Sequence, residues 1–222
     1  MQKLTETVLE KSDTGIFTLM EFARWVGGSS DRRFALLKRA LNSGEVIRIH
    51  RGLYCLASKY LRGKPDPLVL AQRIHGPSYI SLETALSYHD WIPEAVYAIT
   101  SASMDRSREF ETPIGHFSFT RIPQRVFYTE VTRLEKHGGS RTDSGFHGGE
   151  SFFMASPLKA LADYVYAHRL DWASAGPVME SLRVDESSLA GVKFETFDRL
   201  LANYSSFRVR RFLKGLRKDL HK

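Results

Sequence analysis

The 222-residue chain has little of several features that define whole classes of protein. It contains one cysteine, Cys55, so no disulfide can form within the chain. No uncharged run is long enough to span a bilayer. Charged side chains also interrupt the first dozen residues, where a signal peptide would have an apolar core: Lys3, Glu6, Glu10 and Lys11. We therefore expect a soluble, cytoplasmic protein with no membrane segment.

Positive charge is concentrated at the two ends of the chain. Residues 1–64 carry 12 lysines and arginines against 6 acidic residues, and residues 207–222 carry 7 against 1. Residues 65–206 are acidic, with 13 basic and 18 acidic side chains. A basic amphipathic helix can simply be a solvated surface, but such a surface usually mixes both signs, whereas a module that binds a polyanion gathers one sign. The distribution favours nucleic-acid binding by the N-terminal module.

The segment from residue 15 to residue 56 has the order of parts of a winged helix-turn-helix. Thr18 and Glu21 are spaced to cap the start of a first helix, and residues 27–30 interrupt it. Ser29 or Ser30 can cap a second, basic helix that ends before Gly44, with Phe34, Leu37 and Leu41 on its apolar face. A hairpin with an Arg51-Gly52 turn follows.

This pattern predicts which side chains contact DNA. The N-terminal end of a recognition helix reaches base edges, and a hairpin tip contacts phosphates or enters a minor groove. We expect the base edges to be read by Ser29, Ser30, Arg32 and Arg33. We expect the phosphates to be contacted by Lys38, Arg39, Arg48, His50 and Arg51.

Two prolines and a glycine at residues 63–67 indicate a linker, so we expect a winged helix-turn-helix DNA-binding domain over residues 1–64 and a larger domain over residues 65–222. The predicted fold class is α+β. In the larger domain we expect strands at residues 78–81, 95–100, 115–122, 127–131 and 150–154. We expect helices at residues 67–74 and 82–89, after Pro157, and at residues 178–184, 194–204 and 208–221.

Five short motifs carry a resemblance to a known family. They are Gly15–Thr18, Arg48–Tyr54, Tyr79–His89, Ala98–Ala102 and Ala155–Asp163. Together they resemble the AbiEi antitoxin family, the transcriptional-regulator half of abortive-infection type IV toxin-antitoxin pairs. The resemblance covers nearly the whole chain.

The resemblance implies a DNA-binding repressor that autoregulates its operon through inverted repeats in double-stranded DNA. It also implies a C-terminal domain that counters a nucleotidyltransferase toxin without a stable complex. Leu158 stands where family members often carry a glutamate, whereas Lys159 and Asp163 match the family pattern.

The alternative function is a nucleic-acid-processing enzyme, a nuclease or a nucleotidyltransferase, targeted by the winged helix. Metal-dependent cleavage needs clustered carboxylates at a strand end, and the expected strands at residues 95–100 and 116–122 contain none. The segment Gly139–Asp143 is a poor match to a nucleotidyltransferase motif. We therefore expect no catalytic activity.

Two histidine groups deserve comparison with metal and acid-base sites. His137, Asp143 and His147 have a metal-binding composition, but their spacing fits no standard site. His89 and Asp90 lie near Glu83 in sequence, an arrangement more typical of structure than of catalysis. We expect neither a metal nor a cofactor.

The basic run at residues 207–218 predicts a helix with Phe212 and Leu216 on its apolar side. Its cationic end suits a surface helix, since positive charge is favourable near a helix C-terminus. The alternatives are a second nucleic-acid contact and a tail that folds back beside the winged helix.

Overall fold

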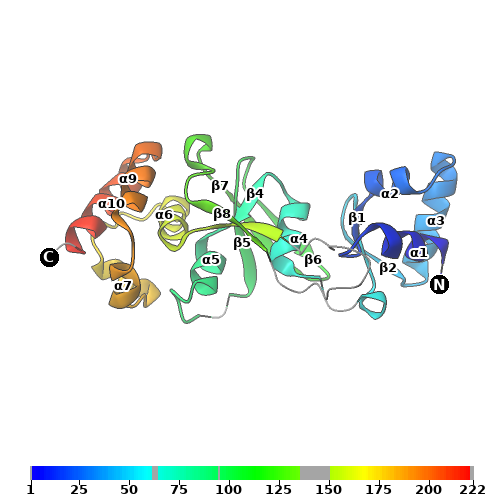
Figure 1. Ribbon diagram of the computed structural model, residues 1–222, viewed down its shortest axis with the longest axis horizontal. Helices are drawn as coiled ribbons and strands as arrows, with labels where there is room; N and C mark the ends of the chain where they lie inside the picture. The colour runs from blue at the N-terminus through cyan, green and yellow to red at the C-terminus, as the bar shows by residue number, and fades with distance from the viewer. Residues whose placement is uncertain (1, 62–64, 95, 136–150, 221–222) are drawn as a thin grey trace, which may run out of the picture.

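The computed structural model describes residues 2–61, 65–94, 96–135 and 151–220. Its elements lie along one long axis, with the N-terminal helices at one end, a sheet in the middle and the C-terminal helices at the other end (Figure 1). The fold is mixed α+β, as the sequence predicted. Within the ranges described, no helix is both long and apolar enough to cross a membrane.

The N-terminal part contains three helices and a small sheet. The elements are α1 (Lys3–Lys11), β1 (Ile16–Thr18), α2 (Leu19–Trp25), α3 (Ser30–Asn42), β2 (Val46–His50), β3 (Leu53–Leu56) and the 3-10 turn η1 (Ser58–Tyr60). The three strands are antiparallel in the order β1-β3-β2. Helix α1 was not predicted from the sequence, and its Leu4 and Val8 are completely buried.

The core of this part differs in one respect from the sequence prediction. Phe17, Phe22 and Leu37 are buried together, and the ring of Phe17 stacks on Tyr54 at 5.7 Å between centroids. The placement of Phe34 on the apolar face of α3 was wrong, because its side chain is 65% exposed. Ala40, not Phe34, is buried beside Leu37.

The central part is a six-stranded sheet in the order β6-β7-β5-β4-β9-β8. Its elements are α4 (Pro67–Ile74), β4 (Ser78–Ile80), α5 (Leu82–Tyr88), β5 (Ala98–Ser103), β6 (Arg108–Thr112), β7 (Gly115–Arg121), η2 (Gln124–Val126), β8 (Val131–Glu135) and β9 (Ser151–Ala155). The pairs β4-β9 and β5-β7 are parallel, and the other pairs are antiparallel.

Two strand predictions in the central part need correction, and one strand was not predicted. The strand expected at residues 95–100 begins at Ala98, and β6 was not anticipated. The strand expected at residues 127–131 is wrong, because a 3-10 turn ends at Val126 and β8 begins at Val131. In contrast, α4 has the bounds that the sequence predicted, with Asp66 capping it and Pro67 at its first position.

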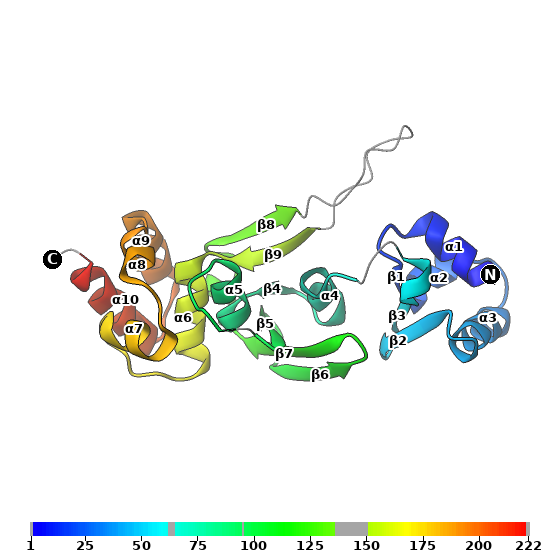
Figure 2. The ribbon, with the colours of Figure 1, turned by 90° about the horizontal axis from the view of Figure 1, so that it is seen from below.

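The C-terminal part consists of helices. They are α6 (Pro157–Ala167), α7 (Gly176–Leu182), α8 (Glu186–Ala190), α9 (Phe194–Asn203) and α10 (Phe207–Asp219). Phe212 and Leu216 of α10 are buried, as expected. The idea that this helix folds back beside the N-terminal helices is wrong, because α10 lies at the opposite end of the molecule from α3 (Figures 1 and 2).

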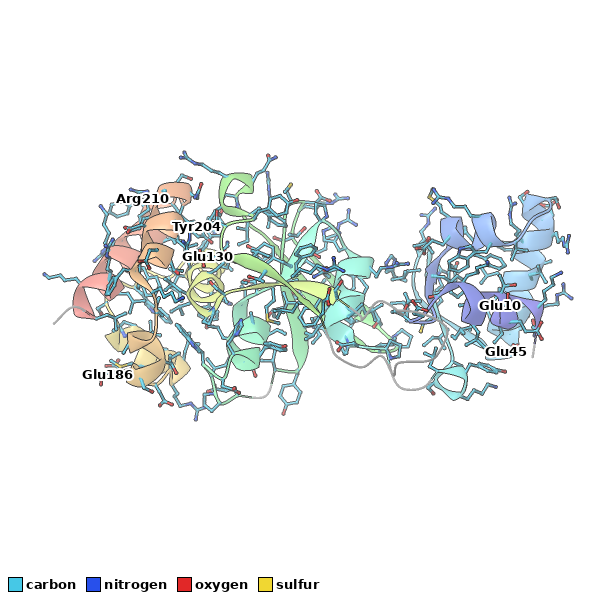
Figure 3. The ribbon with its side chains drawn as sticks, in the orientation of Figure 1. Glu10, Glu45, Glu130, Glu186, Tyr204 and Arg210 are labelled. Atoms are coloured by element: carbon cyan, nitrogen blue, oxygen red, sulfur yellow. The ribbon has the colours of Figure 1, made fainter. Side chains whose placement is uncertain are left out.

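A buried polar cluster joins the sheet to the C-terminal helices. Lys159 and Asp163 on α6 are both 0% exposed, and Lys159 Nζ lies 2.5 Å from Asp163 Oδ1. Asp163 Oδ2 accepts hydrogen bonds from Tyr79 Oη at 2.8 Å and Ser81 Oγ at 2.7 Å. Tyr204, which follows α9 and is labelled in Figure 3, donates to Asp163 Oδ1.

This cluster has features that the sequence alone does not reveal. Lys159 and Asp163 are charged, yet both are buried. Ser81 directly precedes α5, but its hydroxyl donates to Asp163 and makes no cap hydrogen bond. The contacts are hidden in the sequence because the partner groups come from β4, from the residue after β4 and from the residue after α9.

Burial controls the protonation of the cluster. Desolvation lowers the pKa of Lys159, and the nearby Asp163 carboxylate partly offsets that effect. Burial and the same carboxylate raise the pKa of Tyr79 and of Tyr204 well above the usual value. Both phenols therefore remain protonated at neutral pH and donate their hydrogen bonds to Asp163.

Replacing Asp163 with Ala should lower the free energy of unfolding by about 3–5 kcal/mol, because it leaves the Lys159 ammonium buried without a counter-charge. Urea denaturation measures the change. The matched control is Asp198→Ala, which breaks an exposed ion pair with Arg217 and should cost about 1 kcal/mol or less. Equal losses in the two variants would show that the buried pair is not a major source of stability.

Candidate nucleic-acid interface

Side-chain caps begin both α2 and α3, and a glycine lies in the turn between them. The predicted capping box is present: Thr18 Oγ1 accepts from the Glu21 N–H at 3.1 Å, and Glu21 Oε2 accepts from the Thr18 N–H at 2.6 Å. Gly28 has a φ of +104°, a conformation that side-chain-bearing residues rarely adopt. Ser29 then caps α3 by accepting from the Arg32 N–H at 3.3 Å.

The exposed face of α3 carries most of its positive charge. Arg32, Lys38 and Arg39 are exposed, together with the ring of Phe34. Arg39 Nε donates to the Ala35 carbonyl on the same helix at 3.3 Å. Arg32 and Arg39 are seven residues apart and therefore lie on the same side of the helix. Asp31, Ala35 and Asn42 are exposed on the same helix and were not among the predicted contacts.

Two of the four residues predicted to contact base edges already have hydrogen-bond partners within the protein. The hydroxyl of Ser29 is occupied by its capping hydrogen bond. Arg33 is half-buried, and its Nη1 donates back to the Gly28 carbonyl at 2.8 Å. Ser30 is exposed as the first residue of α3. Of the predicted base-reading set, Ser30 and Arg32 thus remain fully presented to solvent.

The hairpin of β2 and β3 presents two arginines. Arg48 and Arg51 are exposed, and Arg48 Nε donates to the His50 carbonyl at 3.4 Å. Gly52, with a φ of +87°, makes the turn, and its carbonyl accepts from the Leu19 N–H at 3.0 Å. This bond fixes the hairpin turn against the start of α2.

His50 lies between the hairpin and the central sheet. Its ring is half-buried, with a centroid 5.6 Å from that of Phe110 on β6, and Figure 2 shows the end of β2 next to β6. Burial is the main cause of the lowered pKa of His50, and the nearby charge of Arg48 adds to it. We therefore leave His50 out of the set of phosphate contacts.

A second contact joins α2 to the central part. Arg73 Nη2 on α4 lies 2.6 Å from Glu21 Oε2, so Glu21 serves both as the capping residue of α2 and as an ion-pair partner. Burial alone would raise the pKa of Glu21, but hydrogen bonds from Thr18 and the charge of Arg73 outweigh it and lower the pKa. Glu21 therefore stays ionised.

The acid-base group suggested by sequence is not assembled. His89 Nε2 lies 2.9 Å from the Ala155 carbonyl oxygen, whereas Glu83 pairs with His168 at 3.1 Å. Over the ranges that the structure covers, no group of three metal-ligating side chains occurs. His137, Asp143 and His147, like Gly139–Asp143 as a whole, lie outside those ranges.

Cys55 is not available as a nucleophile. It is fully buried in β3, and burial raises the pKa of its thiol to about 12. The thiolate is the reactive form, so this cysteine remains a packing residue at neutral pH.

The lowered pKa of His50 predicts a pH-dependent stability. Below the ordinary value of 6.5 the unfolded chain binds a proton at this histidine more readily than the folded chain. The free energy of unfolding should therefore rise with pH through that region and fall on acidification. His50→Phe should flatten this dependence in urea titrations between about pH 5 and 8. An unchanged pH dependence in this variant would contradict the assignment to His50.

The N-terminal part is similar to a known protein family. Residues 6–57, which run from within α1 to just beyond β3, match the family model described as a transcriptional regulator, AbiEi antitoxin. No curated protein matches the chain. The segment that contains α2, α3 and the hairpin is thus similar to the AbiEi antitoxin family of transcriptional regulators.

Proposed function

We propose that this chain is a DNA-binding transcriptional repressor that acts as the antitoxin of a type IV, abortive-infection toxin-antitoxin system and autoregulates its operon. In this proposal residues 1–64 form a winged helix-turn-helix, and residues 65–222 form the antitoxin-like domain. The observation that carries it is the exposed basic face of α3, which follows a capped α2 after a short turn inside the segment that matches transcriptional regulators.

The proposed DNA contact begins with α3 in the major groove. An α-helix with its side chains is about 10–12 Å wide and fits a groove of about 12 Å. Arg32 and Ser30 lie at the N-terminal end of α3, where a recognition helix reaches base edges. The exposed ring of Phe34 suits an apolar contact with a thymine methyl group. Lys38 and Arg39 lie further along the helix and suit phosphates.

The hairpin supplies the remaining proposed phosphate contacts through Arg48 and Arg51. The bond between Gly52 and Leu19 joins its turn to α2, and residues of α3, β2 and β3 share one apolar core that holds the hairpin beside α3. A fixed relation lowers the entropic cost of engaging both surfaces on one duplex. Ser29 and Arg33 support the turn in this proposal rather than reading bases, because their polar groups already have partners.

The C-terminal role in this proposal is not enzymatic. The family that matches the N-terminal part consists of regulators and antitoxins, and we extend that role to the whole chain. Its functional partner would be a nucleotidyltransferase toxin, countered in the cytoplasm without a stable complex. An operator made of inverted repeats would be the DNA ligand. No cofactor is needed for either role.

Replacing Arg32 with Ala should weaken binding to the cognate operator by about 1–3 kcal/mol and weaken binding to random DNA less, because a base contact is lost. Lys38→Ala should weaken binding to both DNAs. It should also reduce the slope of log K against log salt concentration by about 1, the effect of losing one phosphate contact. Fluorescence anisotropy with a duplex from upstream of the chain's own gene measures both affinities at several salt concentrations.

The matched control is Arg211→Ala, which removes an exposed arginine from α10 at the other end of the molecule. It should leave operator affinity unchanged. If Arg32→Ala and Lys38→Ala behave like this control, α3 is not the DNA-binding helix and the proposed function loses its main support.

A further inference from the structure

A cavity of about 380 Å³ lies where the sheet meets the C-terminal helices. Its walls come from the end of β7, the end of α6 and the beginning of α10, and it is far from α3 (Figure 1). Three arginines line it: Arg121, Arg169 and Arg208. The hydroxyl-bearing residues Thr120, Tyr166 and Ser206 line it as well, and no carboxylate does. The cavity therefore has the donors of an anion site.

The three arginines retain free hydrogen-bonding capacity. Arg208 Nε donates to Asp171 Oδ1 at 2.9 Å, which leaves its terminal nitrogens available. Within the described part of the chain, the side chains of Arg121 and Arg169 form no hydrogen bond or ion pair. Three cationic side chains line this cavity and no carboxylate does, so the local charge favours a negatively charged ligand.

The start of α10 adds to the positive potential. Arg208 lies in the first turn of this 13-residue helix, and Ser206 is its N-cap residue. The hydroxyl of Ser206 makes no cap hydrogen bond, so it remains available to the cavity. The first amides of a helix lack partners within the helix and favour an anion. Helix amides, hydroxyls and guanidinium groups are the donors that bind phosphate in proteins.

Arg169 has a left-handed backbone conformation that glycine adopts more easily than arginine does. Its φ is +54°, immediately beyond the end of α6, and the Leu170 N–H closes the helix by donating to the Val165 carbonyl at 3.1 Å. Glycine is the usual residue at this point of such a helix end. The arginine is therefore not required by the turn, and its side chain is directed to the cavity wall.

We propose that this cavity binds the phosphate group of a nucleotide-sized ligand, held by Arg121, Arg169 and Arg208. Its volume lies within the range of about 300–1,000 Å³ that is usual for small-molecule sites. The same phosphate chemistry is offered by a free nucleotide and by the backbone of a nucleic-acid strand. This site is separate from the proposed DNA contact on α3 and does not depend on it.

The test uses the full-length protein, and pyrophosphate, ATP and a single-stranded RNA oligonucleotide serve as separate calorimetric probes. Arg169→Gly removes one guanidinium group and relaxes the backbone, so the variant should fold at least as stably as the parent. Arg183→Gly is the matched control, because Arg183 has the same φ of +54° beyond α7 but lies outside the cavity and pairs with Glu94. Thermal melting confirms that both variants fold.

The expected result is binding of at least one probe, weakened about tenfold or more by Arg169→Gly and by Arg121→Ala and unchanged by Arg183→Gly. Binding of ATP or pyrophosphate without tighter binding of RNA assigns the site to a free phosphorylated ligand. Tighter RNA binding with the same sensitivity assigns it to a strand. The proposal is overturned if no probe binds at millimolar concentration, or if Arg169→Gly and Arg183→Gly behave alike. Operator binding that is unchanged in Arg169→Gly would show that the cavity and the DNA contact on α3 are separate sites.

Discussion

The buried ion pair between Lys159 and Asp163 is the interaction on which the larger part of the molecule depends. A charge removed from water is tolerated only when its lone pairs and protons find partners. Asp163 obtains them from Lys159 on α6, Tyr79 on β4, Ser81 directly after β4, and Tyr204 directly after α9. The pair can therefore be satisfied only when the sheet and the C-terminal helices are in place together. The cluster therefore favours one arrangement of the sheet and the C-terminal helices, because apolar contacts are less directional than hydrogen bonds and ion pairs.

The N-terminal part is joined to the sheet by specific contacts as well as by the chain. Arg73 pairs with Glu21 at the start of α2, and His50 packs on Phe110 of β6. Ile49 and Leu53 also belong to the main apolar core rather than to the core of the N-terminal part. These contacts orient α3 relative to the sheet. A change at either contact would therefore alter how α3 and the cavity near α10 are presented to large ligands.

Local signals explain which elements the sequence predicted well. Asp66 and Pro67 mark the start of α4, and Thr18 with Glu21 marks the start of α2, because capping and proline geometry act within a few residues. The basic surface of α3 was predicted for the same reason. Edge strand β6 was missed because its stability comes from pairing with β7. The orientation of Phe34 was predicted wrongly. In so short a helix, a face that contains Phe34 and Leu37 and a face that contains Leu37 and Ala40 are both apolar, and the sequence does not decide which one is buried.

The sequence by itself determined the α+β class, the caps that bound α2, α3 and α4, and the basic character of α3 and α10, because these follow from side-chain chemistry within one or two helical turns. Only the tertiary structure decided that Arg33 bonds to Gly28 and that His50 packs on Phe110. It also placed Arg121, Arg169 and Arg208 around one cavity. These outcomes depend on segments distant in the chain, whose meeting is set by burial of the whole core rather than by any local pattern.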